Sequence, residues 1–500
     1  MDKRKGFLNV SVSVGFKLIT MVLSIAVKRM LIKTCGNDVN GLNALYLSII
    51  GFLEVAELGI GTAITFCMYR PIVQGDTAKV AALYHLFRRI YTLVGVLILI
   101  CGLLLTPFLH YFAKDYAQLE VNLYSCFVLV LLSVVLTYFF GAKTALINAH
   151  KNNYITTSIN SGGIVLQYTL QIGILQWTRS FSCYLLCKIV ATLAQWIVTE
   201  IISRKKYANL LKSRQKVDPA TRKELMKHIK AMFVHKIGAL LVNTFDGVII
   251  SAFIGVVALG EYSNYTAIMS SMVGVIGLIF SSLTSTWGHV YAKEGKKAAR
   301  EYCELFQYIN FAVGTVFFLG YFAIIDDLIA ILFSEELVVS GYLAAVITIN
   351  GFVQFMRQNA LTFRDITGTF YFDRWKPPVE GLVNIVLSIL FAWWMGVSGV
   401  IVATIITNLV ICHIVEPYVL YKNAFEVSVR QYYFKNYGMM LLFVTALVGF
   451  GQVRWECGHR MIQLLVNGFL SVGISGIVCI LVLLVQPNIR RNLFALFRKG

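Results

Sequence analysis

The stretch that decides the fold, residues 233–265, reads FVHKIGALLVNTFDGVIISAFIGVVALGEYSNY. It is apolar over a length that crosses a membrane, because a helix of about 20 residues spans the hydrocarbon core. It nevertheless carries Lys236, Asn243 and Asp246, and a charge at the bilayer centre costs ~2.5 to 3.5 kcal/mol on insertion scales. Such residues face a protein interior or a wet cavity, so the stretch predicts a membrane-spanning helix with a functional polar face.

This stretch also repeats the beginning of the chain. Adding 219 to a residue number relates the identical pairs Lys17 and Lys236, Gly36 and Gly255, Gly41 and Gly260, Tyr46 and Tyr265, Phe87 and Phe306, and Ile90 and Ile309. Six predicted spans separate the two copies. The halves therefore have the same orientation, as in repeats related by an axis along the membrane normal.

The composition indicates a polytopic helical membrane protein. Hydrophobic residues make up 58% of the chain, charged residues only 14%, and the mean hydropathy is +0.72, which excludes an ordinary soluble fold. The first apolar run contains Lys17 and is interpreted as a span, not a cleavable signal. The ten cysteines show no CxxC or Cys/His metal spacing. No nucleotide, metalloprotease or serine-hydrolase motif is present, so we expect no catalytic residue, no metal and no cofactor.

Hydropathy predicts fourteen spans. They lie at about residues 10–31, 42–68, 90–112, 121–142, 156–177, 183–203, 233–256, 262–288, 305–325, 339–362, 378–396, 399–421, 436–453 and 461–486. We expect an all-α protein with two pseudo-symmetric six-helix lobes and two extra C-terminal helices. The predicted divisions are an N-terminal lobe at 1–203, a basic linker at 204–232, a C-terminal lobe at 233–421, and the added helices with a basic tail at 422–500.

Basic residues fix the expected orientation. Of the 44 Lys and Arg, 33 lie in the loops on one side of these spans and only 7 in the loops on the other side. Cytoplasmic loops carry the excess of Lys and Arg, so both termini are predicted to be cytoplasmic. The net charge of +19 is thus explained by membrane orientation and does not indicate nucleic-acid binding.

Basic residues inside spans are candidates for binding an anionic group. Lys17 and Lys28 are eleven residues apart, about 20° on a helical wheel, and form one cationic face. Arg29 continues this basic segment near the outer end of the span, where it and Lys28 could instead extend to the membrane interface. Lys236, with Asn243 on its face, and Arg357 are further candidates, although Lys236 could likewise reach the cytoplasmic interface.

Polar stripes in spans eleven and twelve allow two interpretations. Glu380, Asn384 and Ser388 recur every four residues, and Thr404 follows in the next span. They can form part of a site or only bond helices together, as small hydroxylic residues do in membranes. Asp246 could similarly be neutralised by a structural partner, and Glu416, near the end of a span, is placed at the interface.

At this point the sequence resembles a known family. The motifs are GLNALY at 41–46, AELGIGTA at 56–63, Tyr69-Arg70-Pro71, Gly75-Asp76, NTFD at 243–246, GEYSNY at 260–265, and Arg364, Gly368, Asp373-Arg374, Pro378, Glu380, Asn384, Ser388, Gly396, Gly399 and Thr404. Together they resemble bacterial polysaccharide flippases of the Wzx type. These belong to the multidrug/oligosaccharidyl-lipid/polysaccharide exporter (MOP) superfamily, and the resemblance covers nearly the whole chain.

The resemblance implies a function at the bacterial inner membrane. The implied partner is an undecaprenyl-pyrophosphate-linked oligosaccharide, moved to the periplasmic leaflet for O-antigen, capsule or exopolysaccharide assembly, among membrane lipids and beside polymerase and chain-length machinery. Cations suit a pyrophosphate where water is scarce, so the expected binding residues are Lys17, Lys28, Arg29, Lys236, Asn243 and Arg357. The superfamily implies coupling to Na+ or H+, for which Asp246, Asn384 and Thr404 are the candidates.

Three alternatives remain open. A lipid II flippase and a multidrug exporter would share the fold, although an exporter of cationic drugs favours an acidic cavity and the buried charges here are mainly basic. An O-antigen polymerase or ligase is also polytopic, but it requires a long external loop with catalytic residues. The sequence does not identify the oligosaccharide, the coupling ion, the oligomeric state or the role of spans thirteen and fourteen.

Overall fold

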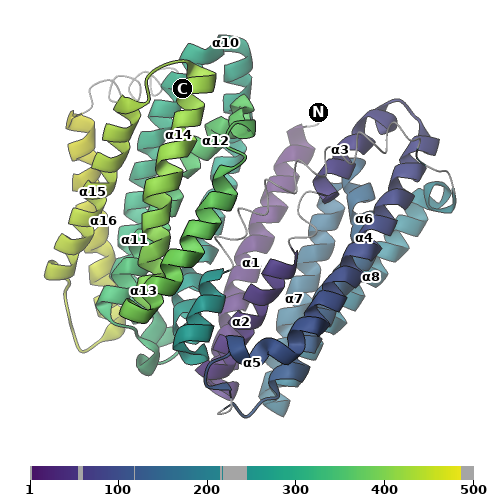
Figure 1. Ribbon diagram of the computed structural model, residues 1–500, viewed down its shortest axis with the longest axis horizontal. Helices are drawn as coiled ribbons and strands as arrows, with labels where there is room; N and C mark the ends of the chain where they lie inside the picture. Colours follow the sequence, from purple (N-terminus) through teal and green to yellow (C-terminus); the bar gives the residue numbers. More distant parts are fainter. Residues whose placement is uncertain (1–2, 55–59, 117–118, 214–216, 218–244, 486–500) are drawn as a thin grey trace. The chain divides into compact units, whose positions relative to one another are not determined.

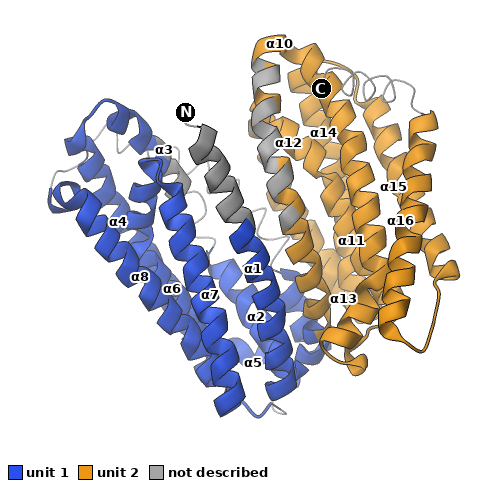
Figure 2. Cartoon of the chain, turned by 180° about the vertical axis from the view of Figure 1, so that it is seen from behind, with its two compact units in different colours: residues 1–260 blue, residues 261–500 orange. Residues whose placement is uncertain are grey.

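The computed structural model describes residues 3–54, 60–116, 119–213, 217 and 245–485, and these residues form helices and connecting turns without a strand. The chain divides into two compact units, Met1–Gly260 and Glu261–Gly500 (Figure 2). Each unit is described by itself below. The division of the chain into lobes and a linker given by the sequence stays a prediction.

The first unit consists of long helices that pack along their lengths (Figure 1). Helix α6 packs between α4 and α8, while α7 packs on α8 and on α1. The elements are α1 (Lys3–Cys35), α2 (Asn37–Leu53), α3 (Ile60–Val73), α4 (Thr77–Leu105), η2 (Thr106–Phe108), α5 (Leu109–Phe112), α6 (Leu123–Ala149), α7 (Asn153–Thr178), α8 (Phe181–Lys212) and the short helical segment Phe245–Ile254, which ends in the π-helical turn η4 (Ile250–Ile254).

The second unit is a bundle that ends in a hairpin of two helices, α15 and α16. Its core is rich in aromatic side chains, such as Phe352 and Phe443, whose rings stack with centroids 3.7 Å apart. The elements are α10 (Val256–Leu332), which begins in the first unit, η5 (Glu335–Leu337), α11 (Gly341–Met356), α12 (Gln358–Thr367), η6 (Thr369–Tyr371), α13 (Lys376–Thr407), η7 (Asn408–Cys412), α14 (His413–Leu420), η8 (Tyr421–Phe425), α15 (Arg430–Val453) and α16 (Arg460–Val485).

Two glycines interrupt long helices of the second unit. Gly295 in α10 has φ 82° and ψ −169°, and Gly396 in α13 has φ 59° and ψ −139°. Glycine adopts positive φ without the steric cost that a Cβ would impose. The breaks fall where the sequence predicts one span to end and the next to begin, so α10 contains two predicted spans, and the helical stretch Lys376–Phe425 that α13 begins contains two more.

Several described helices meet the requirements for crossing a membrane. Within the described part of the chain, seven helical stretches are long and apolar enough, and Phe245–Ile254 is a shorter apolar helix. Two of the seven, Lys293–Leu332 and Lys376–Phe425, are 40 and 50 residues long. A helix rises 1.5 Å per residue, so the longer stretch has room for two passes. A multi-pass helical membrane protein is therefore confirmed, while the count of fourteen spans stays a prediction.

The two copies of the sequence repeat occupy matching local environments. Tyr46 and Tyr265 are both fully buried. The Tyr46 hydroxyl donates to the Leu123 carbonyl at 2.6 Å, and the Tyr265 hydroxyl donates to an Asp326 carboxylate oxygen at 2.8 Å. A buried phenol needs such an acceptor, which explains why both copies retain a tyrosine at this position.

The glycines of the repeat meet in a corner of the first unit formed by residues 36–41 and 255–260. Gly36 and Gly255, at φ 93° and 145°, turn the chain into the next helix. A Cβ on Gly41 would lie 1.8 Å from the Val256 carbonyl oxygen, and one on Gly260 would lie 2.4 Å from the Asn37 carbonyl oxygen. The offset of 219 relates residue 37 to 256 and 41 to 260, so these contacts are equivalents of one another. Only glycine fits at either position.

Candidate functional site

The basic face of α1 is one part of the candidate site. Lys17 and Arg29 are exposed and Lys28 is half-buried. The hydroxyls nearby are turned to their own helix, since Thr20 donates to the Lys17 carbonyl at 3.0 Å and Ser24 to the Met21 carbonyl at 2.7 Å. None of the ion pairs between described residues involves Lys17 or Arg29. The described part of α1 therefore presents positive charge on an otherwise apolar helix.

The next group of candidates lies around Phe245–Ile254. Lys236 and Asn243 fall outside the described residues, so their placement is not tested. Asp246 lies in the first unit and is buried. A buried carboxylate on an apolar helix is costly unless it is compensated, which keeps Asp246 a candidate for a functional role.

Arg357 lies at the junction of α11 and α12, where it contacts three side chains from other helices. Its guanidinium donates to both carboxylate oxygens of Glu416, at 2.6 Å and 3.3 Å. Nη1 also donates to the Asn408 side-chain oxygen at 2.6 Å and to a Glu380 oxygen at 3.3 Å. The two bonds to Glu416 form the bidentate geometry in which arginine binds a carboxylate most strongly. The predicted cation is thus held in a protein network.

Lys376 completes this network. Its Nζ lies 2.8 Å from a Glu380 oxygen and 2.5 Å from a Glu416 oxygen. We call Arg357, Lys376, Glu380, Asn408 and Glu416 the charge cluster. Two cations balance two carboxylates, and every charged side chain in it is at most 15% exposed. Buried ions are tolerated when they are paired and hydrogen-bonded, so the charge cluster is neutral and self-contained.

Glu416, which the sequence places at the membrane interface, has a side chain only 1% exposed, so it faces the protein interior, and its depth in the membrane stays a prediction. A carboxylate near a span end can reach the interface, but here two cations from α11–α12 and α13 hold it inside. Sequence reasoning also missed Lys376 as a cluster member, along with the adjoining buried pair of Arg364 and Asp373, whose atoms are 2.8 Å apart. The signal in the sequence that could have identified these pairs was the presence of oppositely charged residues in neighbouring spans.

The polar stripe of α13 leads away from the charge cluster. Asn384 donates its amide to the Thr404 hydroxyl at 2.9 Å, and both side chains are buried. The Asn384 side-chain oxygen and the Ser388 hydroxyl are buried without a hydrogen-bond partner among the described residues. Buried polar atoms normally have partners, so these oxygens have lone pairs available to a ligand. Asp246, the third residue predicted for this site, belongs to the other unit.

A second charged network ties the α15–α16 hairpin to the end of α10. Arg454 contacts Asp326 at 2.8 Å, Arg460 contacts Asp327 at 3.2 Å, and Gln463 donates to Asp327 at 3.0 Å. Asp326 also accepts from Tyr265. By the predicted orientation this network is external, so the added helices are fastened at the end of the unit opposite to the charge cluster.

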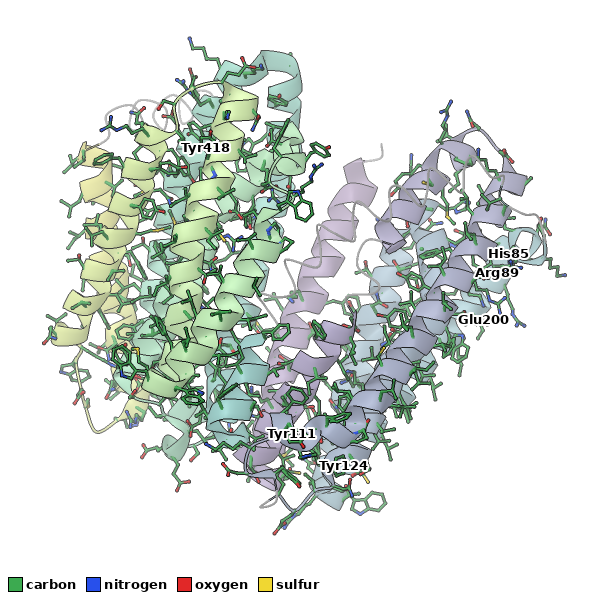
Figure 3. All side chains as sticks on the ribbon, viewed as in Figure 1. His85, Arg89, Tyr111, Tyr124, Glu200 and Tyr418 are labelled. Carbon is green, nitrogen blue, oxygen red and sulfur yellow. The ribbon has the colours of Figure 1, made fainter. Side chains whose placement is uncertain are left out.

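The first unit also has charged and tyrosine side chains at different levels. Figure 3 shows Glu200, His85 and Arg89 partway along the helices of this unit, and Tyr111 with Tyr124 at its lower end. Glu200 pairs with Lys143 and, at 2.6 Å, with Arg204. Tyrosines are enriched where helices end at membrane interfaces.

Comparisons with known proteins place the fold. No protein-family profile matches the chain, and a search of the curated proteins finds no match. Among solved structures, the chain is similar to the lipid II flippase MurJ, with a TM-score of 0.66 and 11% identity over 93% of this chain and 97% of that one.

It is also similar to a multidrug resistance MATE transporter in an inward-facing conformation, with a TM-score of 0.65 and 13% identity over 83% of this chain and 98% of that one. A third similar structure is a MOP-superfamily transporter from Pyrococcus furiosus whose binding pocket has reversed polarity, with a TM-score of 0.59 and 14% identity over 86% and 98%. At these identities the likeness establishes the fold, which is that of the MOP-superfamily transporters.

Proposed function

We propose that the protein is a flippase that moves an undecaprenyl-pyrophosphate-linked oligosaccharide across the bacterial inner membrane. The observation that carries the proposal is the basic face of α1, where Lys17 and Lys28 project from one side of an apolar helix. A pyrophosphate is recognised by cations, and each contact is strong where water is scarce. The polyprenyl chain would stay in the bilayer while the head group passes.

The similar structures include both a lipid-linked cargo flippase and multidrug transporters. The lipid II flippase matches 93% of the chain, whereas the multidrug transporter in its inward-facing conformation matches 83%. Pocket polarity also differs among transporters of this fold, and a cationic face suits an anionic cargo.

We further propose that Asp246, Asn384 and Thr404 couple transport to Na+ or H+. Carboxylate, amide and hydroxyl oxygens are hard ligands of the kind that bind hard cations. The support is the pair of buried oxygens on Asn384 and Ser388 that lack hydrogen-bond partners among the described residues. Arg357 is the least favoured of the proposed binding residues, because the charge cluster already neutralises it.

The test is translocation of a labelled undecaprenyl-pyrophosphate oligosaccharide in proteoliposomes. We expect Lys17→Gln and Lys28→Gln to lower the initial rate at least tenfold, and Lys205→Gln, an exposed position on α8, to leave it unchanged. Lipid II and a cationic dye serve as rival cargoes. Faster movement of either rival would reject the proposed cargo. Equal rates in all three variants would reject the α1 face as its binding site. Glycosyl transfer by the purified protein would reject a pure transporter.

A further inference from the structure

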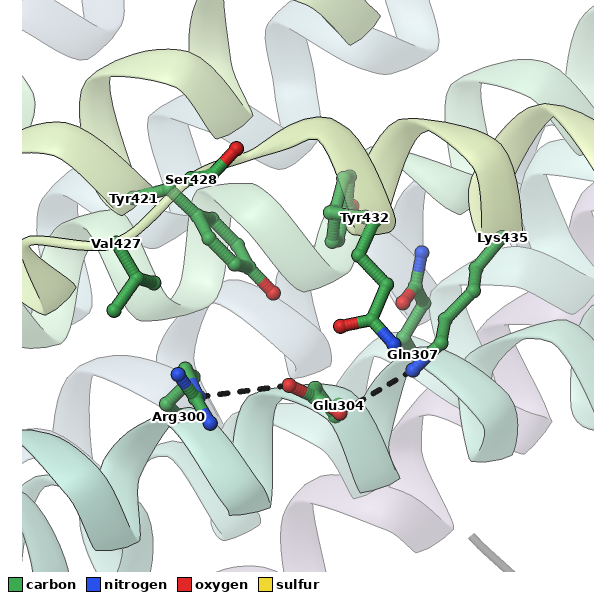
Figure 4. Close-up of a pocket in the computed structure, with 9 residues that line it drawn as sticks. Arg300, Glu304, Gln307, Tyr421, Val427, Ser428, Tyr432 and Lys435 are labelled. Carbon is green, nitrogen blue, oxygen red and sulfur yellow. Dashed lines mark hydrogen bonds and ion pairs between the residues drawn. The ribbon is translucent and has the colours of Figure 1, made fainter. Parts of the chain in front are cut away.

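A polar pocket lies in the second unit between α10 and the start of α15 (Figure 4). It encloses about 320 Å³, including its open mouth. Residues from one face of α10 form one wall, and residues from η8 and α15 form the other. The lining includes Arg300, Glu304, Gln307, Tyr421, Tyr432 and Lys435. No residue of this pocket belongs to the charge cluster or to the α1 face.

The charges in the pocket do not balance. One carboxylate, Glu304, lies between two cations: its oxygens are 3.3 Å from Lys435 Nζ and 3.6 Å from Arg300 Nε. The second distance is too long for a hydrogen bond. Arg300 Nε is accordingly buried without a hydrogen-bond partner among the described residues. The pocket therefore carries a net positive charge, and Arg300 Nε is a hydrogen-bond donor available to a ligand.

A second donor comes from α15. Lys435 has a side chain only 15% exposed, and its ammonium group has three hydrogens, of which the contact with Glu304 uses one. A ligand with several anionic oxygens would accept from Arg300 and pair with Lys435.

The surface beside the pocket suits hydrocarbon. Phe434, Leu441 and Val448 follow one another at seven-residue intervals on α15, and they are 77%, 68% and 58% exposed. Residues seven apart lie on the same face of a helix. An apolar stripe therefore runs along the helix from the level of the pocket, whose lining residue Lys435 is the neighbour of Phe434.

The predicted orientation places the pocket at the cytoplasmic end, where anionic lipids attract basic groups and pockets between spans bind lipid head groups. We propose that this pocket binds the phosphate of an anionic phospholipid, with the acyl chains along the Phe434–Leu441–Val448 stripe. The phosphate oxygens accept from Arg300 and Lys435. This inference does not depend on the proposed cargo.

Native mass spectrometry of the full-length, delipidated protein tests the site, with phosphatidylglycerol, phosphatidylcholine and inorganic phosphate as separate probes. We expect phosphatidylglycerol to bind at least tenfold more tightly than either of the others. Full competition by inorganic phosphate at comparable concentration would assign the pocket to free phosphate instead and overturn the lipid proposal. Equal binding of the two lipids would overturn it as well.

Matched variants locate the binding. Arg300→Gln combined with Lys435→Gln should weaken phosphatidylglycerol binding at least tenfold. Lys293→Gln combined with Lys297→Gln removes the same charge from exposed positions on α10 and should change it less than twofold. If both double variants lose the same affinity for phosphatidylglycerol, the lipid is held by general electrostatic attraction and the proposed site is rejected. Glu304→Gln, which removes the competing carboxylate, should strengthen binding severalfold, and weaker binding in that variant would also contradict the proposal.

Discussion

Replacing Gly41 by alanine should open the corner formed by residues 36–41 and 255–260. The added Cβ would lie 1.8 Å from the Val256 carbonyl oxygen, 2.8 Å from its carbonyl carbon and 2.9 Å from the Gly260 nitrogen. A carbon approaches a carbonyl oxygen no closer than about 3.3 Å even in a favourable contact. All three atoms belong to the backbone, so no side-chain rotation relieves the clash, and one helix end has to move by roughly 1.5 Å.

The expected cost follows from the rigidity of this contact. Overfilling a packed interior costs ~1 to 3 kcal/mol when side chains can adjust, and a backbone contact belongs at the upper end of that range. A loss of about 3 kcal/mol corresponds to roughly a hundredfold change in the unfolding equilibrium constant. Gly260→Ala, which meets the Asn37 carbonyl oxygen at 2.4 Å, should cost a similar amount because it fills the equivalent contact.

The assay is denaturation of the purified protein in mixed micelles by increasing dodecyl sulfate, followed by far-ultraviolet circular dichroism. Gly162→Ala is the matched control, since this α7 glycine has no atom within 4 Å of its added Cβ. Alanine favours a helix over glycine by up to ~1 kcal/mol, so the control should be neutral or slightly stabilising. If Gly41→Ala unfolds at the same point as the control, the close packing of the corner is refuted.

Three further outcomes are expected. Glu416→Gln leaves two buried cations facing one carboxylate and should lower the free energy of unfolding by about 3 kcal/mol, whereas Glu426→Gln in an exposed pair should change nothing measurable in the same denaturation assay. Arg454→Gln removes the partner of Asp326 and should make the 454–459 turn more sensitive to limited proteolysis; unchanged cleavage would contradict the role of that pair. Asn384→Ala should abolish the dependence of transport on a Na+ or pH gradient while gradient-free exchange persists, and an unaltered gradient dependence would count against the coupling site.

Much of the local structure could be predicted from the sequence. The identical residues at an offset of 219 include glycines and tyrosines, and these types are required where the backbone turns with positive φ, where two backbones touch, or where a buried phenol needs an acceptor. Gly41 with Gly260, and Tyr46 with Tyr265, do occupy such matching places. Hydrophobic length likewise predicts helices, since a membrane leaves the backbone few other ways to satisfy its hydrogen bonds.

The partners of the buried charges could not be predicted in the same way. Hydropathy locates a residue along the membrane normal, but it does not reveal which neighbouring helix that residue faces. Arg357 meets Glu380 and Glu416 only because α11, α13 and α14 pack with those positions at one level. Asp326 and Asp327 likewise meet Arg454 and Arg460 only because the α15–α16 hairpin packs on the end of α10.

The charges of the two units are used differently, and this bears on where an anionic cargo could bind. In the second unit Arg357 and Lys376 each contact two carboxylates, so bringing a pyrophosphate to them would require breaking buried ion pairs, which costs more than it returns unless the carboxylates are neutralised as well. On α1 the exposed Lys17 and Arg29 enter no ion pair among the described residues. The proposed cargo would therefore be recognised at lower cost by the first unit, while the paired charges of the second unit stabilise the helices that carry Asn384 and Thr404.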